Sequence, residues 1–362
     1  MKPTATEERA CQFLIELVTS IVGKTLPNNP LELIGSRRTG LAVATSDIDF
    51  SLSIPEYEKN DPTVRGPSPM RPEARKDRLK KFFVLSHALR RSEQFMLVDV
   101  IHARIPIVTA MHRHTGLTVH IQGLHSTLAA RTCVAGYLSE YPTLRSLYIL
   151  LRSALDMRVL TTVLEGGLGS YTIFMMIVNA LKHASLPSSS GYGITRHDLA
   201  AQLFWVLDFY ATADLRKNGY SIDPPRVFPK AEEHVVRVDG NPDVTTRVRH
   251  ELDTIFKYKP KQPYLLCLQD PADPTNDLGS KSHTIMHVQK TFKLASELLK
   301  RNVDYFDNLH PRPIKKGTNS ILYPLVGANY KRFTYARNQM SKAAARREDW
   351  GPEALSRVAI MF

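Results

Sequence analysis

Cysteine is scarce in this sequence, and no long uninterrupted apolar run occurs. The three cysteines, Cys11, Cys133 and Cys267, stand in apolar surroundings and form no CxxC pair. Their placement argues against a disulfide framework and for buried thiols in a reducing, intracellular compartment. The apolar stretch at 147–151 ends at Arg152. We therefore predict no transmembrane span and no membrane partner, because a helix needs about 20 apolar residues to cross a bilayer.

Acidic residues are outnumbered by basic ones. The chain has 48 Lys and Arg against 35 Asp and Glu, which gives a formal net charge of +13. Such a field suits polyanionic partners such as RNA, DNA, a ribosomal surface or anionic lipid. A basic surface that only keeps the protein in solution is the alternative. The net charge suits a location in the nucleus or in a mitochondrion and does not distinguish the two.

Hydrophobic periodicity predicts both helices and strands. The chain has 362 residues, 43% of them apolar, which is enough for two domains with ordinary cores. Helical spacing occurs at 7–22, at about 72–91, within 128–215 and at 283–305. Strands are predicted for LELIG, DIDFSLSI, QFMLVDVIHARIPIVTAMH and GLTVHIQ. The proline-rich stretch 55–69 reads as a surface loop, and 221–263 gives little periodic signal.

These elements predict an α+β fold with a mixed sheet and a mainly helical second domain. We expect the α/β domain at 30–122. The helical domain is expected to comprise 123–310, and residues 1–29 are expected to join it. Residues 311–362 would form a basic C-terminal extension.

The helix predicted at 72–91 is amphipathic and strongly basic. Its spacing directs Phe82, Phe83, Leu85 and Leu89 inward, and Arg75, Lys76, Arg78, Lys80 and Lys81 outward. The tail adds Arg332, Arg337, Lys342, Arg346 and Arg347. We predict that both segments contribute a sequence-independent RNA surface, whose affinity falls steeply with salt.

The segment SDIDFSL, at 46–52, carries two aspartates on one face of a predicted strand. The period of two places Asp47, Asp49 and Ser51 on one face, and Ile48, Phe50 and Leu52 on the core face. Two carboxylates on the same side can chelate Mg²⁺, a hard ion that prefers oxygen ligands. Alternating acidic residues are also common on solvated strands, so this pattern alone does not distinguish a metal site from a solvated strand face.

A short polar loop connects these aspartates to Gly35 and Ser36. A glycine lets the backbone approach a phosphate closely, and a serine hydroxyl can donate to it. Gly35-Ser36 followed by Asp47-Ile48-Asp49 resembles the active-site signature of DNA polymerase β-like nucleotidyltransferases.

Two further segments strengthen this resemblance. LCLQDPADPTNDLGSKS, at 266–282, resembles the nucleotide recognition motif of the template-independent RNA nucleotidyltransferases, which include Trf-type poly(A) polymerases and terminal uridylyltransferases. GGLGSYTIFMMIV, at 166–178, is similar to the start of their central, poly(A) polymerase-associated helical domain. The matches occur in the expected order and cover roughly 10–305. The resemblance implies a polymerase β-like palm at 30–122.

For the palm, the resemblance implies a triphosphate site and a metal site. Gly35 and Ser36 would hold the triphosphate of ATP or another nucleoside triphosphate. Asp47 and Asp49 would bind Mg²⁺ or Mn²⁺.

For the helical domain, the resemblance implies contacts to the nucleotide. Arg152 would replace a lysine that reaches the triphosphate, which keeps the charge but not the geometry. Ser170 would contact phosphate, and Tyr171 would stack on the base. Asn276 and Asp277 would help to set the base and the shape of the pocket. The alternatives are that Tyr171 is a core residue and that DPADPTND is a proline-pinned turn that caps the next helix.

The sequence departs from the family at the third catalytic carboxylate. Relatives carry it on the strand of a following hairpin, where it completes the metal site and accepts the proton of the attacking 3′ hydroxyl. Here that strand is LTVHIQ, and the matching position holds His120, while Asp99 stands before the hairpin and does not match. Arg131 stands where uridylyltransferase-like members carry an asparagine near the ribose. Both changes bear on catalysis.

Two functions follow from these matches and departures. The first is a template-independent RNA 3′-end nucleotidyltransferase, most simply a poly(A) polymerase, which would bind its nucleotide between the two domains and use a two-metal mechanism. The second is a catalytically inactive member that binds RNA or a ribonucleoprotein as a scaffold. A minor alternative is a zinc cluster of His112, His114 and His125.

Overall fold

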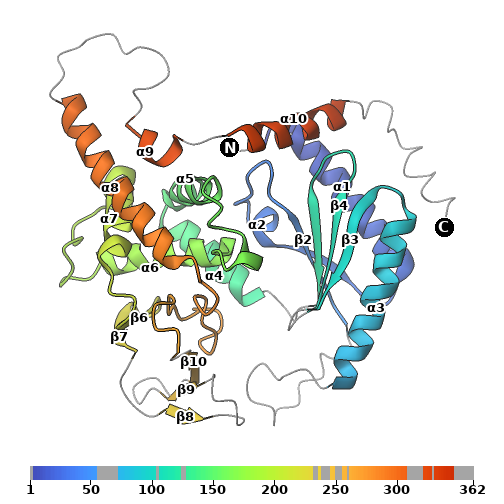
Figure 1. The fold of residues 1–362 in the computed structure, drawn as a ribbon, viewed down its shortest axis with the longest axis horizontal. Helices are drawn as coiled ribbons and strands as arrows, with labels where there is room; N and C mark the ends of the chain where they lie inside the picture. Colours follow the sequence, from blue (N-terminus) through green and yellow to red (C-terminus); the bar gives the residue numbers. More distant parts are fainter. Residues whose placement is uncertain are drawn as a thin grey trace. The chain divides into compact units, whose positions relative to one another are not determined.

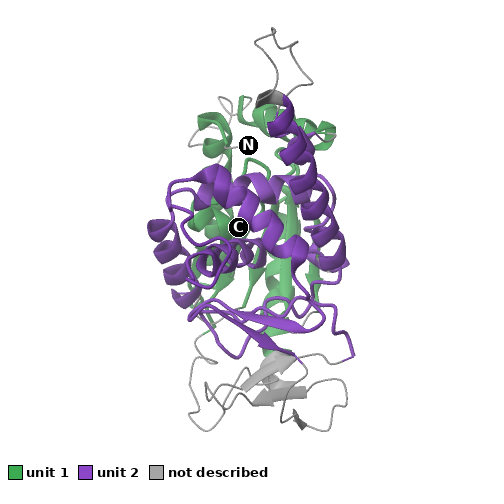
Figure 2. Cartoon of the chain, turned by 90° about the vertical axis from the view of Figure 1, so that its left-hand side faces the viewer, with its two compact units in different colours: residues 1–127, 330–362 green, residues 128–329 purple. Residues whose placement is uncertain are grey.

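The computed structural model describes residues 3–54, 72–102, 106–123, 128–230, 235–237, 245–248, 255–258, 261–307, 321–327 and 330–345. The chain divides into two compact units (Figure 2). Unit 1 comprises residues 1–127 and 330–362, and unit 2 comprises residues 128–329. The loop predicted at 55–69, His125, Arg346 and Arg347 lie outside the described residues. None of the described helices has the length and apolarity needed to cross a bilayer.

A five-stranded mixed sheet forms the centre of unit 1 (Figure 1). Its strand order is β1-β2-β5-β4-β3, in which β2 and β5 run parallel and the other neighbours run antiparallel. The strands are β1 (Leu31–Ile34), β2 (Ile48–Leu52), β3 (Phe95–Ile101), β4 (Ile107–His112) and β5 (Thr118–Gln122). The mixed sheet expected from the sequence is therefore present.

Helices α1 (Ala5–Thr25) and α3 (Pro72–Arg91) share one hydrophobic core with this sheet. Leu14 and Leu17 of α1 are fully buried in that core, together with Phe50 of β2. Helix α10 (Lys331–Ala345) packs against α1 and buries Met340 in the same core. The boundaries therefore differ from those expected. Residues 1–29 and the end of the tail belong with the palm, because the apolar face of α1 is covered by the sheet.

The inner face of α3 agrees with the predicted pattern at most positions. Phe82, Leu85 and Leu89 are fully buried. Phe83, which was expected to face inward, is 42% exposed. Arg78, which was expected to face solvent, is buried and donates a hydrogen bond of 2.8 Å to the carbonyl of Gly123. Helical periodicity places Arg78 on the solvent side, because the pattern does not record that Gly123, 45 positions further along the chain, supplies a hydrogen-bond partner.

Unit 2 is mainly helical, as expected. Its helices are α4 (Leu128–Glu140), α5 (Leu144–Asp156), η2 (Val163–Glu165), α6 (Ser170–Ala184), α7 (Leu199–Thr212), α8 (Ile285–Asp307) and α9 (Tyr323–Val326). The stretch with little periodic signal contains a hairpin, β6 (Asn218–Ser221) and β7 (Arg226–Pro229), and a small sheet of β8 (Val235–Arg237), β9 (Thr245–Val248) and β10 (Ile255–Tyr258). All three cysteines are free thiols, and Cys133 is half-buried rather than buried.

Candidate active site

The two aspartates of the sequence motif lie at the start of β2. Ile48 and Phe50 are buried beneath them, which agrees with the predicted alternation. Asp47 is exposed just before the strand, and Asp49 is half-buried on it. Ser51 was expected on the same open face but is buried. The two solvent-accessible carboxylates therefore lie at the N-terminal end of β2.

Gly35 lies directly against Asp49. It starts the short helix α2 (Gly35–Arg38) and has a φ of +69°, a conformation that residues with a side chain rarely adopt. A Cβ at this position would lie 2.4 Å from Oδ2 of Asp49. The backbone at Gly35 and the carboxylate of Asp49 therefore occupy positions that only glycine allows. Ser36 follows on α2, where its carbonyl accepts a hydrogen bond of 2.8 Å from the backbone N–H of Leu41.

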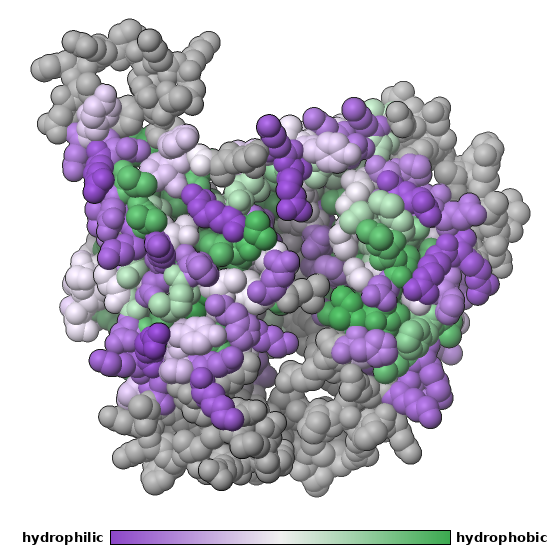
Figure 3. All heavy atoms as spheres, viewed as in Figure 1, coloured by the Kyte–Doolittle hydropathy of each residue, from purple (hydrophilic) through white to green (hydrophobic). Residues whose placement is uncertain are grey.

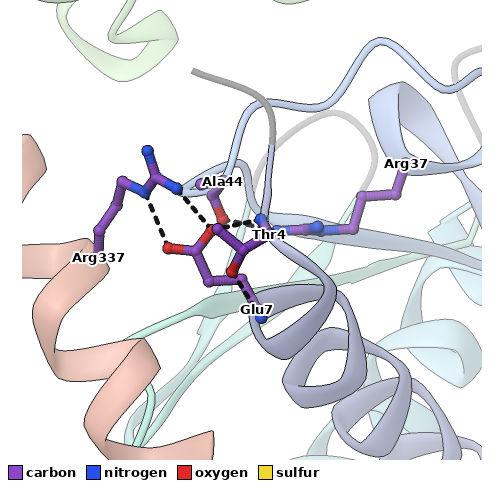
Figure 4. A network of polar contacts seen from close by, with 5 residues as sticks. All are labelled: Thr4, Glu7, Arg37, Ala44 and Arg337. Carbon is purple, nitrogen blue, oxygen red and sulfur yellow. Dashed lines mark hydrogen bonds and ion pairs between the residues drawn. The ribbon is translucent and has the colours of Figure 1, made fainter.

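Arg37 holds the loop that leads to Asp47. Its guanidinium donates hydrogen bonds to the carbonyls of Ala44 and Ser46. Figure 4 shows this side chain extending from α2 toward Ala44. The Ser46 hydroxyl in turn accepts a hydrogen bond of 3.0 Å from the backbone N–H of Val43. Sequence reasoning missed Arg37, although an arginine beside the apolar stretch LAVA was a usable signal for a buried donor.

His120 lies next to Asp49 on the neighbouring strand. The parallel register of β2 and β5 pairs Asp49 with His120. Nδ1 of His120 is 3.2 Å from Oδ1 of Asp49, and both side chains are about one-third exposed. Burial by itself lowers the pKa of His120, but the hydrogen bond to Asp49 and the charges of Asp47 and Asp49 outweigh it and raise the pKa. The imidazole is thus placed to pair with the aspartate in its charged form.

The other candidate metal ligands of unit 1 do not join this group. Asp99 is exposed on β3, and its Oδ1 accepts a hydrogen bond from the backbone N–H of Val100. His112 is buried, with Nδ1 2.9 Å from the hydroxyl of Thr115, and burial lowers its pKa to about 4. Among the described residues, no three His, Cys, Asp or Glu side chains gather as a metal-binding group. The zinc alternative therefore has no support from His112 and His114.

In unit 2, Tyr171 and the recognition loop meet at Asp270. The hydroxyl of Tyr171 donates to Oδ1 of Asp270 at 2.9 Å, and Nδ2 of Asn276 donates to Oδ2 of the same carboxylate at 3.0 Å. Asp270 is buried, and Tyr171 is half-buried. Burial and the charge of Asp270 raise the pKa of Tyr171. Sequence reasoning singled out Tyr171 and Asn276 but not Asp270, the residue that joins them.

Asp277 has a structural position in the loop. It is buried, and its Oδ1 accepts hydrogen bonds from the backbone N–H groups of Leu268 at 3.0 Å and Gly279 at 2.8 Å. Asp277 thus holds the backbone of the loop, and its contribution to pocket shape stays a prediction. A pocket of about 100 Å³ lies beside this loop. It is lined by Ser221, Ile222, Asp223, Gln269, Asp270, Pro271 and Pro274.

Arg152 and Ser170 lie on α5 and α6, which pack against each other. Nη2 of Arg152 is 3.3 Å from Oδ1 of Asp156, while its Nη1 is buried and makes no hydrogen bond within the described structure. Ser170 opens α6 and hydrogen-bonds the hydroxyl of Tyr148. A buried guanidinium nitrogen with an open donor is suited to an anionic oxygen such as that of a phosphate. Arg131, on α4, is half-buried.

Comparisons with known proteins agree with the fold. The family model described as the central palm domain of mitochondrial-like poly(A) RNA polymerase matches residues 1–128. The poly(A) RNA polymerase cid14 of Schizosaccharomyces pombe is 29% identical over 307 residues, which cover 82% of this chain and 38% of that protein. The polymerase core of TRAMP, an RNA surveillance complex, has the same fold, with a TM-score of 0.62, 20% identity and 85% of each chain covered.

This chain is similar in sequence to poly(A) RNA polymerases and shares its fold with solved template-independent RNA nucleotidyltransferases. It spans well under half the length of several poly(A) polymerase relatives, from 34% to 45%. A relative from Drosophila melanogaster named as an inactive poly(A) RNA polymerase protein, Trf4-2, is 24% identical over 341 residues, which cover 92% of this chain and 74% of that protein. A protein whose match covers nearly the whole length of this chain is therefore named as inactive.

Proposed function

We propose that this chain is a template-independent RNA 3′-end nucleotidyltransferase of the poly(A) polymerase type, with a transfer step slowed by His120. It would take ATP or another nucleoside triphosphate and an RNA 3′ end. The observation that carries the proposal is the arrangement on β2, where Asp49 lies against Gly35 and 3.2 Å from Nδ1 of His120. The glycine that lets the backbone approach a phosphate and the carboxylate of Asp49 are both retained. The position of the third catalytic carboxylate holds His120 instead.

The carboxylates of Asp47 and Asp49 fit a divalent cation. Mg²⁺ is commonly held by one or two carboxylates together with substrate phosphates, and Mn²⁺ also accepts imidazole. A bound cation would neutralise charge on the triphosphate. In its neutral form His120 can donate its Nδ1–H to Asp49 and accept a proton at Nε2, whereas in its charged form it is an ion-pair partner of Asp49 and cannot act as a base. The balance between these two states is what would limit the rate.

The residues of unit 2 would hold and orient the nucleotide. The half-buried Tyr171 would offer a face of its ring for the base, and stacking of this kind contributes about 1 to 3 kcal/mol. The hydrogen bonds of Asp270 to Tyr171 and Asn276 fix the orientation of that ring. The open Nη1 of Arg152 suits a phosphate oxygen.

The expected loss at the third position is large. A carboxylate about 4 Å from a cation attracts it by roughly 4 kcal/mol per unit of ion charge at an effective dielectric near 20. Because about 1.4 kcal/mol corresponds to tenfold in rate, replacing it with His120 should slow transfer by about a thousandfold. The residual activity should be higher in Mn²⁺ than in Mg²⁺.

A second candidate is a member without transfer activity that binds RNA or a ribonucleoprotein as a scaffold. The contact between His120 and Asp49 favours it, because a protonated imidazole there occupies the carboxylate that a cation needs. The relative named as inactive gives it a precedent within the family. An RNA-processing protein partner is then expected, in a nucleus or a mitochondrion, where the net charge of +13 meets abundant RNA.

An extension assay separates the two candidates. Purified protein is incubated with labelled RNA and each of the four nucleotides, in Mg²⁺ and separately in Mn²⁺. Slow extension that disappears in Asp49→Ala and rises in His120→Asp supports the transferase. No extension by the wild type or by a correctly folded His120→Asp protein, with RNA binding intact, supports the scaffold.

A further inference from the structure

Helix α10 presents a basic face that the nucleotide site does not use. Its sequence, KRFTYARNQMSKAAA, contains no acidic residue. Met340 and Ala343 are buried, so these positions define the side that packs on unit 1. Figure 3 shows mainly hydrophilic side chains on the surface over α10.

An ion pair fixes the orientation of α10. Nε and Nη2 of Arg337 donate to Oε1 and Oε2 of Glu7 on α1, each at 2.8 Å. Glu7 is 1% exposed and also caps α1 through its hydrogen bond with the backbone N–H of Thr4. This bidentate pair resists rotation of the helix, because both oxygens of a buried carboxylate are engaged. Arg337, which was expected to contribute to an RNA surface, is therefore committed to the protein.

The outer face of α10 combines cations with an exposed aromatic ring. Arg332, Tyr335, Asn338 and Lys342 are all exposed, and their spacing places them on one side of the helix. Tyr335 is 66% exposed, so its ring is open to a partner molecule. The four residues extend about 15 Å along the helix axis. Cations that flank an open ring are the arrangement by which proteins bind single-stranded nucleic acid without sequence preference.

The docked side of α10, at Arg337, lies near the loop that leads to Asp47. Figure 4 shows Arg337 and Glu7 beside Thr4, with Ala44 and the end of the Arg37 side chain next to them. Ala44 belongs to the loop that Arg37 holds and that ends at Asp47. All of these residues belong to unit 1. An RNA strand on the outer face of α10 would therefore be held on the same unit as Asp47.

We propose that Arg332, Tyr335, Asn338 and Lys342 form a binding face for single-stranded RNA, which holds the strand upstream of its 3′ end. Arg332 and Lys342 pair with phosphates, and Tyr335 stacks on a base. The inference rests on the proposed function, because it assumes that RNA is the polymer bound. An acidic protein segment is the other occupant that the charge would allow.

Fluorescence anisotropy with a short unstructured RNA tests the face. Arg332→Gln/Lys342→Gln is compared with Lys24→Gln/Arg113→Gln, which removes two exposed cations of unit 1 that are not on α10. We expect Arg332→Gln/Lys342→Gln, but not the control pair, to lower RNA affinity by at least tenfold. The slope of log affinity against log salt should also fall by about 1.4, because each single-strand phosphate contact contributes about 0.7. Tyr335→Ala should weaken binding by about five- to hundredfold, with little change in that slope.

The outcomes separate this inference from the proposed function. Absence of RNA binding by the wild type overturns both. Wild-type binding that is equal in the α10 variants and in the control pair overturns the face alone. Binding of a polyglutamate peptide that only the α10 variants lose, with RNA affinity unchanged, assigns the face to an acidic protein instead. Thermal melting of every variant verifies that α10 remains docked.

Discussion

A Cβ on Gly35 would lie 2.4 Å from Oδ2 of Asp49. This distance is shorter than any van der Waals contact, and the φ of +69° adds strain for any residue but glycine. Gly35→Ala should therefore displace Asp49, lower the melting temperature and weaken Mn²⁺ binding. Gly23→Ala is the control, because nothing lies within 4 Å of its Cβ position on α1. It should raise stability by up to about 1 kcal/mol. Equal metal affinity in both variants would contradict the close packing of Gly35 and Asp49.

Tyr171 offers a test of nucleotide binding that does not depend on catalysis. Tyr171→Ala removes both the ring and the hydroxyl that donates to Asp270, whereas Tyr171→Phe removes the hydroxyl alone. If the ring stacks on the base, the alanine variant should lose about 1 to 3 kcal/mol of nucleotide affinity and the phenylalanine variant much less. Calorimetry with a non-hydrolysable triphosphate measures both. Equal losses would assign the effect to the contact with Asp270 rather than to stacking.

Glu7 should make stability depend on acid pH. Burial by itself raises the pKa of Glu7, but the hydrogen bonds from Arg337 and Thr4 have the larger combined effect and lower it below the ordinary value of 4.5. A carboxyl with a lowered folded-state pKa contributes stability above its unfolded pKa and loses it as pH falls through the folded one. The wild type should thus lose more stability than Glu7→Gln as the pH falls from neutral to below the ordinary pKa of a glutamate. Denaturant unfolding at several pH values measures this, with the exposed Glu8→Gln as control. Parallel pH profiles of wild type and Glu7→Gln would count against the ion pair.

Lys230 should stabilise the segment that precedes the recognition loop. It is 4% exposed, and its ammonium donates to the carbonyls of Leu215, Pro263 and Leu265. Lys230→Met keeps the length of the side chain but leaves these carbonyls without their donor, which should cost at least about 2 kcal/mol. Lys217→Met, at a side chain that is 82% exposed, should change stability by less than about 0.5 kcal/mol. Chemical denaturation compares them, and similar midpoints would show that the buried ammonium is dispensable.

Local pattern predicted much of the fold and part of the site. The bounds of α3 agree with the helix predicted at 72–91, and the alternation on β2 buries Ile48 and Phe50. Periodicity works at these positions because one face of each element meets the core. The closeness of His120 to Asp49 could be anticipated only through the family resemblance, since the two residues lie 71 positions apart.

By itself, the sequence determined the elements, their core faces and the residues able to carry the chemistry, because these depend on neighbours along the chain. Only the tertiary structure decided the partners of the charged side chains. Arg78 was counted as a surface cation and is buried on Gly123, and Arg337 pairs with Glu7 across 330 positions. Burial of a charge is favourable only where distant groups supply its hydrogen bonds, and no local pattern records where those groups lie.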